Sequence, residues 1–185
     1  MSLTTEIRQS TAADVDLSQT ASQLIASVTN EFDIARRTPE FLVEKIESGQ
    51  AALALDNGDL VGFGYYSDWE DGRFVSHSGL VVKTEYRGQG LGRQLKTVLF
   101  AASRQRFPDA IVMSLTSSPE VKAMNLKLGF QVVSTAALTS DKTFWEGCKT
   151  CRRYAQTQAK GLKCCCTAMI LKPGTAAAIP PPSSG

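Results

Sequence analysis

The most informative segment of the sequence is Leu80-Val81-Val82-Lys83-Thr84-Glu85-Tyr86-Arg87-Gly88-Gln89-Gly90-Leu91-Gly92-Arg93. It begins as an apolar strand, continues through a loop with three glycines and enters an amphipathic helix. Glycine lets the backbone adopt a positive φ and approach a ligand closely. The first N–H groups of a helix have no partner inside the helix, and the helix dipole adds positive charge there. The stretch therefore predicts a phosphate-binding loop between a strand and a helix.

The spacing of these glycines excludes two other phosphate-binding motifs. A Walker loop needs Gly-Lys-Ser/Thr after its last glycine, and that sequence is absent here. A dinucleotide-binding fold needs Gly-x-Gly-x-x-Gly, whereas the run from Gly88 to Gly92 is Gly-x-Gly-x-Gly. An ordinary strand-to-helix turn that binds nothing remains the alternative.

Strands and helices alternate on both sides of this loop. Before it we expect a strand at 6–10, helices at 14–32 and 39–49, a hairpin of 51–55 and 60–67 turned by Asn57-Gly58, and a strand at 74–82. After it we expect a helix at 92–107, a strand at 111–116, a helix at 119–128 and strands at 130–135 and 167–171. This order predicts a mixed α/β sheet.

Length and composition favour one globular domain. The chain has 185 residues, of which 43% are hydrophobic and 21% charged, and its net charge of +2 gives no support to overall polyanion binding. No run of 18 apolar residues predicts a membrane span, and the start lacks the pattern of a secretory signal, so we expect a cytoplasmic protein with reduced thiols. Residues 1–172 are predicted to form the domain and 173–185 a disordered tail.

The spacing of Arg87, Gly90 and Gly92 resembles the pyrophosphate loop of the GNAT superfamily of acetyltransferases. The segment Leu126-Lys127-Leu128-Gly129-Phe130 looks like the helix-to-strand junction of the same family. The resemblance covers residues 5–136 and the strand at 167–171. It implies an α/β (α+β) fold whose mixed central sheet is splayed between two strands and flanked by helices, with the pantetheine arm of CoA inserted in the opening.

The resemblance also implies which residues bind acetyl-CoA. The backbone of Val81, Val82 and Lys83 would contact the pantetheine arm, and the Val82 N–H would stabilise the oxyanion. The pyrophosphate would be bound by Arg87, Gly88, Gln89, Gly90, Leu91, Gly92 and Arg93. The implied reaction is transfer of an acetyl group to a primary amine, by direct attack in a ternary complex.

Such a reaction needs a group that takes a proton from the amine, since a free amine has a pKa near 10.4. His77, the only histidine, is one candidate base, and strand alternation places it on one face with Val75 and Val81. Glu70, in the acidic loop 68–72, is the other candidate. The alternatives are a hydrogen-bonded core histidine and a solvated loop charge.

Two positions depart from the family pattern. Asn125 stands where the family often has a tyrosine general acid, and an amide can donate a hydrogen bond to sulfur but cannot protonate it. Ser118 replaces the asparagine that opens the acceptor helix. A catalytically weak or inactive CoA-binding sensor is therefore an alternative function.

All five cysteines lie between residues 148 and 166. Cys148-x₂-Cys151 is followed after twelve residues by Cys164-Cys165-Cys166, a spacing typical of a small zinc site. The predicted ligands are Cys148, Cys151, Cys164 and Cys166, with Cys165 pointing away. An iron–sulfur cluster, free thiols or disulfides are the alternatives. The cluster lies in an expected insertion, residues 138–166, between the last two strands.

Basic residues surround these cysteines. Residues 142–172 hold seven basic residues and one acidic residue, a local charge of +6. This charge would offset a zinc–thiolate centre or contact a phosphate, and we favour the first interpretation. Nucleic acid is therefore not an expected partner, although a zinc-stabilised binding module remains a third functional alternative. The acceptor is expected to be a small-molecule or protein amine, and the chain a monomer or homodimer.

Overall fold

Seven strands form one sheet in the computed structural model, which describes residues 5–175. The strands are β1 (Thr5–Gln9), β2 (Ala51–Asp56), β3 (Asp59–Trp69), β4 (Phe74–Val82), β5 (Ile111–Thr116), β6 (Gln131–Val133) and β7 (Thr167–Leu171). The α-helices are α1 (Ser18–Ser27), α2 (Pro39–Glu47), α3 (Leu91–Arg106), α4 (Pro119–Lys127), α5 (Lys142–Glu146) and α6 (Tyr154–Ala159). Short 3₁₀ helices are η1 (Ala12–Leu17), η2 (Thr84–Tyr86), η3 (Thr135–Ala137) and η4 (Gly147–Thr150). The predicted mixed α/β sheet is confirmed.

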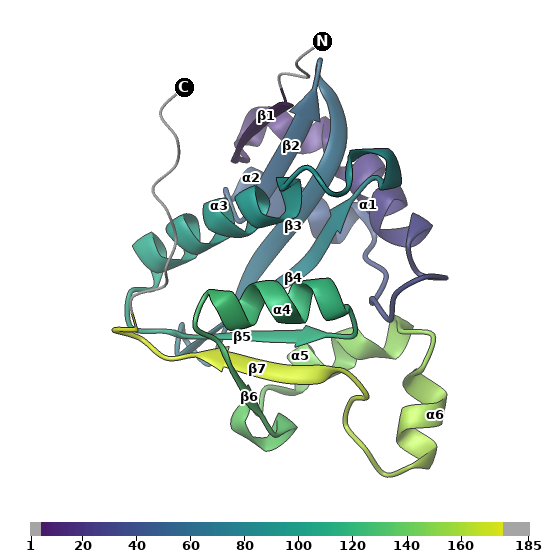
Figure 1. Cartoon of the computed structure of the whole chain (residues 1–185), viewed down its shortest axis with the longest axis vertical. Helices are drawn as coiled ribbons and strands as arrows, with labels where there is room; N and C mark the ends of the chain where they lie inside the picture. Colours follow the sequence, from purple (N-terminus) through teal and green to yellow (C-terminus); the bar gives the residue numbers. More distant parts are fainter. Residues whose placement is uncertain (1–4, 176–185) are drawn as a thin grey trace.

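The sheet opens between its two central strands. The strand order is β1-β2-β3-β4-β5-β7-β6, and β4 and β5 are parallel while the other pairs are antiparallel. β4 and β5 pair only where 74–76 face 111–113, and beyond that point the two strands diverge, as Figure 1 shows. This splay agrees with the expected fold.

Helices cover both faces of the sheet (Figure 1). α3 crosses the front of β1–β4 in that view, while α1 and α2 lie behind it. Leu91, Leu95 and Leu99 of α3 are buried against one face, and Ile25 and Leu42 of the other helices are buried against the opposite face. Each fully buried side chain of this size contributes about 1.5–3 kcal/mol, so both faces stabilise the sheet.

Local sequence signals determine several element ends. The Thr38 hydroxyl accepts a hydrogen bond from the Phe41 N–H at 3.3 Å, and Pro39 begins α2, as predicted. The Asn57-Gly58 turn joins β2 to β3 with φ values of 50° and 89°. The predicted helix at 14–32 is instead η1 followed by α1, which ends at Ser27.

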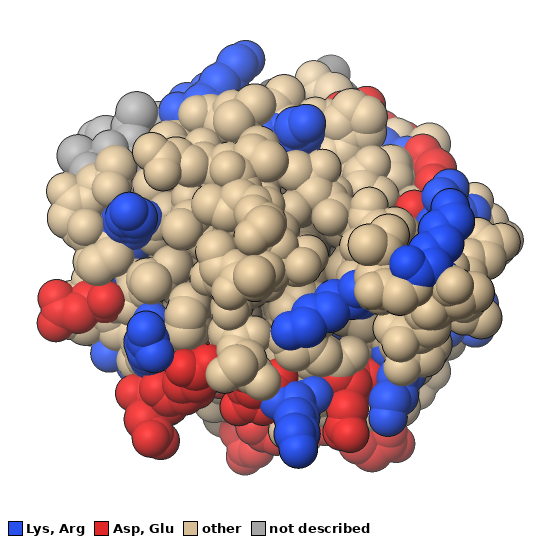
Figure 2. Space-filling view, turned by 90° about the horizontal axis from the view of Figure 1, so that it is seen from below, with Lys and Arg blue, Asp and Glu red and all other residues tan. Residues whose placement is uncertain are grey.

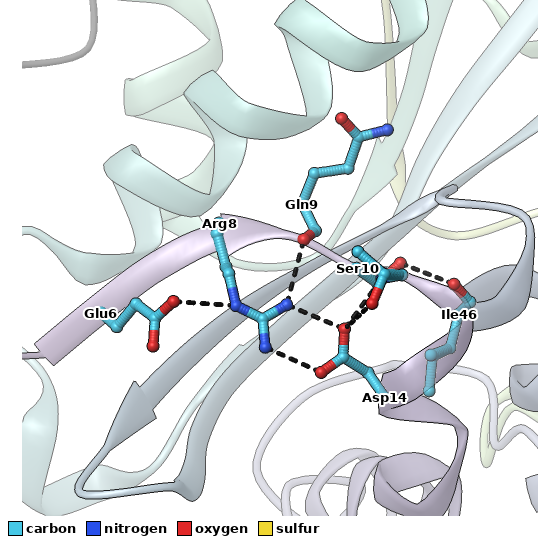
Figure 3. Close-up of polar contacts among 7 residues, drawn as sticks. Glu6, Arg8, Gln9, Ser10, Asp14 and Ile46 are labelled. Atoms are coloured by element: carbon cyan, nitrogen blue, oxygen red, sulfur yellow. Dashed lines mark hydrogen bonds and ion pairs between the residues drawn. The ribbon is translucent and has the colours of Figure 1, made fainter.

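An ion-pair cluster connects β1 to η1 (Figure 3). The Arg8 guanidinium donates two hydrogen bonds to the Asp14 carboxylate, at 2.8 and 2.7 Å, and one to Glu6 at 2.9 Å. The Thr11 N–H also donates to Asp14, at 2.8 Å. These bonds hold the pKa of the Asp14 carboxyl well below its usual value. They attach η1 to β1 and shape the entry into α1.

A β-bulge interrupts β4. Phe63 of β3 faces Val81, but Tyr65 faces Ser78, so β4 has one extra residue at this point. Val75 consequently packs against α3, whereas Val81 packs against the α1–α2 side. The prediction that Val75, His77 and Val81 share one face is therefore wrong, because the bulge inverts the alternation.

Residues 138–166 form a small cap of α5, η4, α6 and a loop. It contacts the segment between α1 and α2: Arg37 donates to the Gly147 carbonyl at 3.1 Å, and Thr150 donates to the Arg36 carbonyl at 3.2 Å. None of the helices within residues 5–175 is long and apolar enough to cross a membrane. Most of the predicted disordered tail, 176–185, lies outside the described residues.

Candidate coenzyme and acceptor site

The glycine-rich loop presents a series of free amides. Within the described chain, the N–H groups of residues 88–93 have no hydrogen-bond acceptor. Gly88 and Gly90 have φ values of 77° and 82°, and Gly90 is the N-cap of α3. A Cβ atom at Gly88, Gly90 or Gly92 would meet nothing within 4 Å. The loop is therefore an open concavity of amides at a helix N-terminus, which suits a phosphate group.

Arg87 closes one side of this loop. Its Nε donates to the Val82 carbonyl at 3.1 Å, and its Nη1 donates to the Glu31 carboxylate at 2.8 and 3.0 Å. The N–H of the next residue, Lys83, points the other way and donates to the Val61 carbonyl of β3 at 2.9 Å. Because the N–H and C=O of one strand residue point to the same side, the Val82 N–H points into the opening between β4 and β5.

A cavity of about 600 Å³ extends from the loop into the opening between β4 and β5. Val81 and Val82 line it, as do Arg87, Gly88 and the residues from Gly90 to Arg93. Lys83 and Gln89 do not line it. The structure therefore brings eight of the ten predicted coenzyme residues to one cavity. Its other walls come from the segment after α1, from the end of β5 and from α4.

A second cavity of about 120 Å³ lies on the α1–α2 side of the sheet. Its polar lining includes Asp33, Arg37, Tyr65 and Ser78. Both cavities are lined by Asp33, Ile34, His77, Ser78, Gly79, Ser114 and Leu115. The two cavities therefore meet at the splay, where the paired parts of β4 and β5 end.

His77 has the environment of a core histidine. Its ring faces α3, and its Nε2 lies 3.0 Å from the Ser103 Oγ. The ring also packs edge-on against Phe100, with the two ring centres 4.8 Å apart. Burial, followed by the charges of Lys96 and Arg104, lowers the pKa of His77 well below its ordinary value. The imidazole is thus neutral at pH 7, and its ring packs against α3.

Glu70 lies away from both cavities. It follows β3 in a left-handed conformation, with φ of 51°, and its Oε1 accepts from the Thr139 hydroxyl at 2.6 Å and the Ser140 N–H at 2.9 Å. These hydrogen bonds lower the pKa of the Glu70 carboxyl. Glu70 lines neither cavity and connects the β3–β4 turn to the cap.

Asn125 is fully buried behind the opening. Its Nδ2 donates to the Ser114 Oγ at 3.2 Å, while its Oδ1 has no partner. Asn125 lines neither cavity. Its amide connects α4 to β5.

Asp33 is a site residue that the sequence did not single out. It lines both cavities, and its side chain is 9% exposed. The carboxylate accepts from the Nε atoms of Arg152 at 2.6 Å and Arg153 at 3.0 Å. Nothing in the stretch Glu31-Phe32-Asp33-Ile34 distinguishes this carboxylate from a surface charge. Only the docking of the cap identifies it.

The predicted zinc ligands do gather in space, because Cys148, Cys151, Cys164 and Cys166 all line the small cavity. Cys165 is exposed, and all five cysteines are free thiols. Hydrogen bonds from Cys148 and Cys166 lower the pKa of the Cys164 thiol well below its ordinary value. The same hydrogen bonds to Cys164, together with burial, raise the pKa of the Cys148 and Cys166 thiols.

This arrangement does not support zinc. Among residues 5–175, no three or more His, Cys, Asp or Glu side chains form a group that could hold a metal ion. The thiols are instead placed against the backbone: the Cys166 N–H donates to Cys164 Sγ at 3.4 Å, and Cys166 Sγ lies 3.9 Å from the Asp33 carbonyl oxygen. The residues present thus do not fit a four-thiolate metal centre.

The basic residues of the cap also differ from their predicted role. Arg152 and Arg153 bind Asp33 instead of facing a metal centre. Lys149 pairs with Glu146 on the surface at 3.7 Å. Figure 2 shows a mainly uncharged face, with basic side chains scattered over it and acidic ones gathered along one edge.

The fold and the loop geometry agree with a family comparison. The acetyltransferase (GNAT) family profile matches residues 21–130. The chain belongs to the GNAT acetyltransferase family. No curated protein sequence gives a significant match.

Solved GNAT structures share this fold. N-acetylglutamate synthase from Neisseria gonorrhoeae, complexed with coenzyme A and N-acetyl-glutamate, aligns with a TM-score of 0.65 at 16% identity, over 91% of this chain and 35% of that one. A Mycobacterium tuberculosis protein in complex with CoA gives a TM-score of 0.63 at 17% identity, over 90% and 98%. The putative acetyltransferase yncA from Salmonella typhimurium, solved with acetyl-CoA, gives 0.63 at 18% identity, over 94% and 96%. This GNAT chain therefore spans about a third of the synthase but nearly all of the other two proteins.

Proposed function

We propose that this GNAT chain transfers the acetyl group of acetyl-CoA to a primary amine by direct attack in a ternary complex. The observation that carries the proposal is the meeting of two cavities at the β4–β5 splay. One cavity extends to the free amides of the loop, and the other opens on the opposite face of the sheet. Donor and acceptor can then be bound at the same time, on either side of the reacting carbonyl. Similar structures solved with CoA and acetyl-CoA support this choice of donor.

The donor side follows from the backbone. The amides of residues 88–93 would hold the pyrophosphate, and the pantetheine arm would run along β4. The Val82 N–H points into the opening and is available to the thioester or its oxyanion. Such a fixed donor stabilises developing charge without reorganisation. Lys83 and Gln89, which line neither of the two cavities, would contribute only from the rim.

The acceptor side depends on Asp33 in this proposal. Its carboxylate lies at the junction of the cavities and would orient the ammonium group of the acceptor. The ammonium first releases one proton to solvent water. The neutral amine nitrogen then forms the C–N bond while the C–S bond breaks, and the second proton that it loses passes to the CoA thiolate. Since a thiol of this type has a pKa near 8.5, the thiolate can leave without a general acid, which agrees with the buried position of Asn125.

Mass spectrometry of acetylated products tests the proposal. The protein is incubated with acetyl-CoA and a panel of amino acids, polyamines and peptides, and calorimetry measures CoA binding separately. We expect turnover of at least one amine, and Asp33→Asn should lower kcat/KM by at least about tenfold while the Kd for CoA stays within about threefold. Glu146→Gln, which removes an exposed carboxylate of the cap, is the matched control. Absence of CoA binding would overturn the proposal.

A non-catalytic CoA sensor is the second candidate. It is favoured by one observation: Glu70 and Asn125 line neither cavity, and the His77 ring faces α3. The same experiment separates the two functions, because a sensor binds CoA without forming product on any amine. A zinc-stabilised binding module has no support in the thiol arrangement.

A further inference from the structure

We infer that the acyl end of the coenzyme cavity accepts a carboxylate-terminated acyl group, of the succinyl type, whose carboxylate pairs with the Lys96 ammonium. The inference rests on the proposed CoA site and names the class of acyl donor that this site would take. Lys96 lies on α3, is 2% exposed, and lines the coenzyme cavity. The buried face of α3 otherwise packs apolar side chains, and a lysine is rarely buried on such a face without a partner.

The position of Lys96 relative to the loop places it at the acyl end of the cavity. The pyrophosphate amides lie at the open end of the splay, and the closed end is where β4 and β5 begin to pair. From Val82 to His77, β4 covers about 16 Å at roughly 3.3 Å per residue. An arm that starts at the loop and runs down this strand points its thioester toward the closed end. His77, Lys96 and Ser114 line the cavity there.

Lys96 has no anionic partner in the protein. None of the ion pairs among residues 5–175 includes it. Its Nζ instead lies 5.2 Å from the centre of the Phe130 ring and 5.9 Å from that of Phe100. Aromatic faces stabilise a cation only partly, and burial lowers the pKa of Lys96 to about 7. A carboxylate brought in by the ligand would complete this site.

One polar atom near Lys96, the His77 Nδ1, also lacks a hydrogen-bond partner within the described chain. Ser103 donates its hydroxyl hydrogen to the Phe100 carbonyl at 3.3 Å, so its oxygen accepts from the His77 Nε2–H. That assignment leaves His77 Nδ1 as a lone-pair acceptor, and this buried atom has no partner. His77 is 6% exposed. A protonated Lys96 beside the cavity has three hydrogens to donate, so it can bind the oxygens of an incoming carboxylate.

The Lys96 ammonium at the closed end of the cavity favours some acyl groups over others. The methyl end of a butyryl group would face a buried ammonium and leave it unpaired, which is unfavourable. The carboxylate of a succinyl group, of the same chain length, would form an ion pair with it. Transfer itself is unchanged: the amine nitrogen forms the C–N bond, the C–S bond breaks, the CoA thiolate takes the proton, and the distal carboxylate is not consumed.

Comparing succinyl-CoA with butyryl-CoA tests the inference. Calorimetry measures the Kd of CoA, butyryl-CoA and succinyl-CoA for the wild-type chain and for Lys96→Met, which keeps the side-chain length and removes the charge. Lys127→Met, an exposed change on α4, is the control. We expect the wild type and the control to bind succinyl-CoA at least about tenfold more tightly than butyryl-CoA, and Lys96→Met to lose or reverse this preference while its Kd for free CoA changes less than about threefold.

The outcomes separate this inference from the proposed function. Equal binding of the two acyl-CoA molecules by the wild type, with CoA itself bound, overturns the inference and leaves the proposed function standing. No binding of any CoA species overturns both. Peptide mass spectrometry that finds Lys96 acylated would make it an internal acceptor and would also overturn the ion-pair role. Because Lys96→Met removes a buried unpaired charge, we expect this variant to fold.

Discussion

The glycine-rich loop and the cysteine-bearing cap both contain a short motif that predicts a ligand, yet the structure supports only one of them. In the loop, the predicted ligand-binding groups are backbone amides, and their direction depends on the conformation of a few adjacent residues. In the cap, the predicted groups are four side chains, and two of them follow the other two by about a dozen residues. Their mutual geometry depends on how α5, η4 and α6 pack on the α1–α2 segment. A backbone site is thus easier to infer from sequence than a side-chain site.

The largest expected effect is on the backbone site itself. Gly90→Ala places a Cβ at a residue with φ of 82°, a conformation that costs a non-glycine residue about 1–2 kcal/mol. A shift away from it would also redirect the amides of the loop. We expect the Kd for CoA to rise at least about tenfold, measured by calorimetry. Gly58→Ala, in the β2–β3 turn with φ of 89°, is the control and should lose similar stability with unchanged CoA binding. Equal CoA affinity in the two variants would contradict the role of the loop.

The next effect concerns how the cap is attached. Asp33→Asn removes a carboxylate that pairs with Arg152 and Arg153 while its own side chain is 9% exposed. We expect a loss of about 1–2 kcal/mol in the free energy of unfolding, since both arginines stay half-exposed to water. Chemical denaturation measures it. Glu146→Gln breaks an exposed pair with Lys149 and should cost less than about 0.5 kcal/mol. A loss no larger than that of this control would show that Asp33 does not hold the cap.

A pH-dependent effect tests the buried lysine. The pKa of Lys96 is lowered to about 7 in the folded state, against about 10.4 in an unfolded chain. Between these values the unfolded chain binds one more proton than the folded one, so stability increases with pH in this window. Relative to Lys96→Met, we expect the free energy of unfolding of the wild type to increase by about 1 kcal/mol per pH unit from pH 7.5 to 9. Parallel pH profiles of the two proteins would refute the buried-cation assignment.

The smallest expected effect distinguishes hydrogen-bonded thiols from metal ligands. In Cys148→Ser a hydroxyl can replace the S–H donor to Cys164, so we expect a loss of only about 1 kcal/mol in unfolding free energy. Cys165→Ser, at the exposed cysteine, should be neutral. Chelator treatment should leave both melting curves unchanged. Stoichiometric zinc in anaerobically purified protein, together with a loss of several kcal/mol in Cys148→Ser, would restore the zinc interpretation.

Much of the fold was predictable because its signals are local. The predicted strand at 74–82 coincides with β4, and Thr38-Pro39 and Ser118-Pro119 begin helices where expected. The bulge in β4 was not predictable, because it depends on how Gly79 passes the Tyr65 ring: a Cβ at this glycine would lie 2.6 Å from that ring. That single insertion moved Val81 to the opposite face from His77. It also turned the candidate base toward α3.

The conformation of the glycine-rich loop follows from local sequence, because positive φ at glycine and unpaired amides at a helix start are properties of neighbouring residues. The side chains that line the two cavities, in contrast, could be identified only from the folded chain. Asp33 reaches both cavities because the cap binds it, Lys96 meets the cavity because α3 packs over the splay, and Glu70 is drawn away by Thr139. Such placements result from packing between segments far apart in the chain, and no local pattern contains that information.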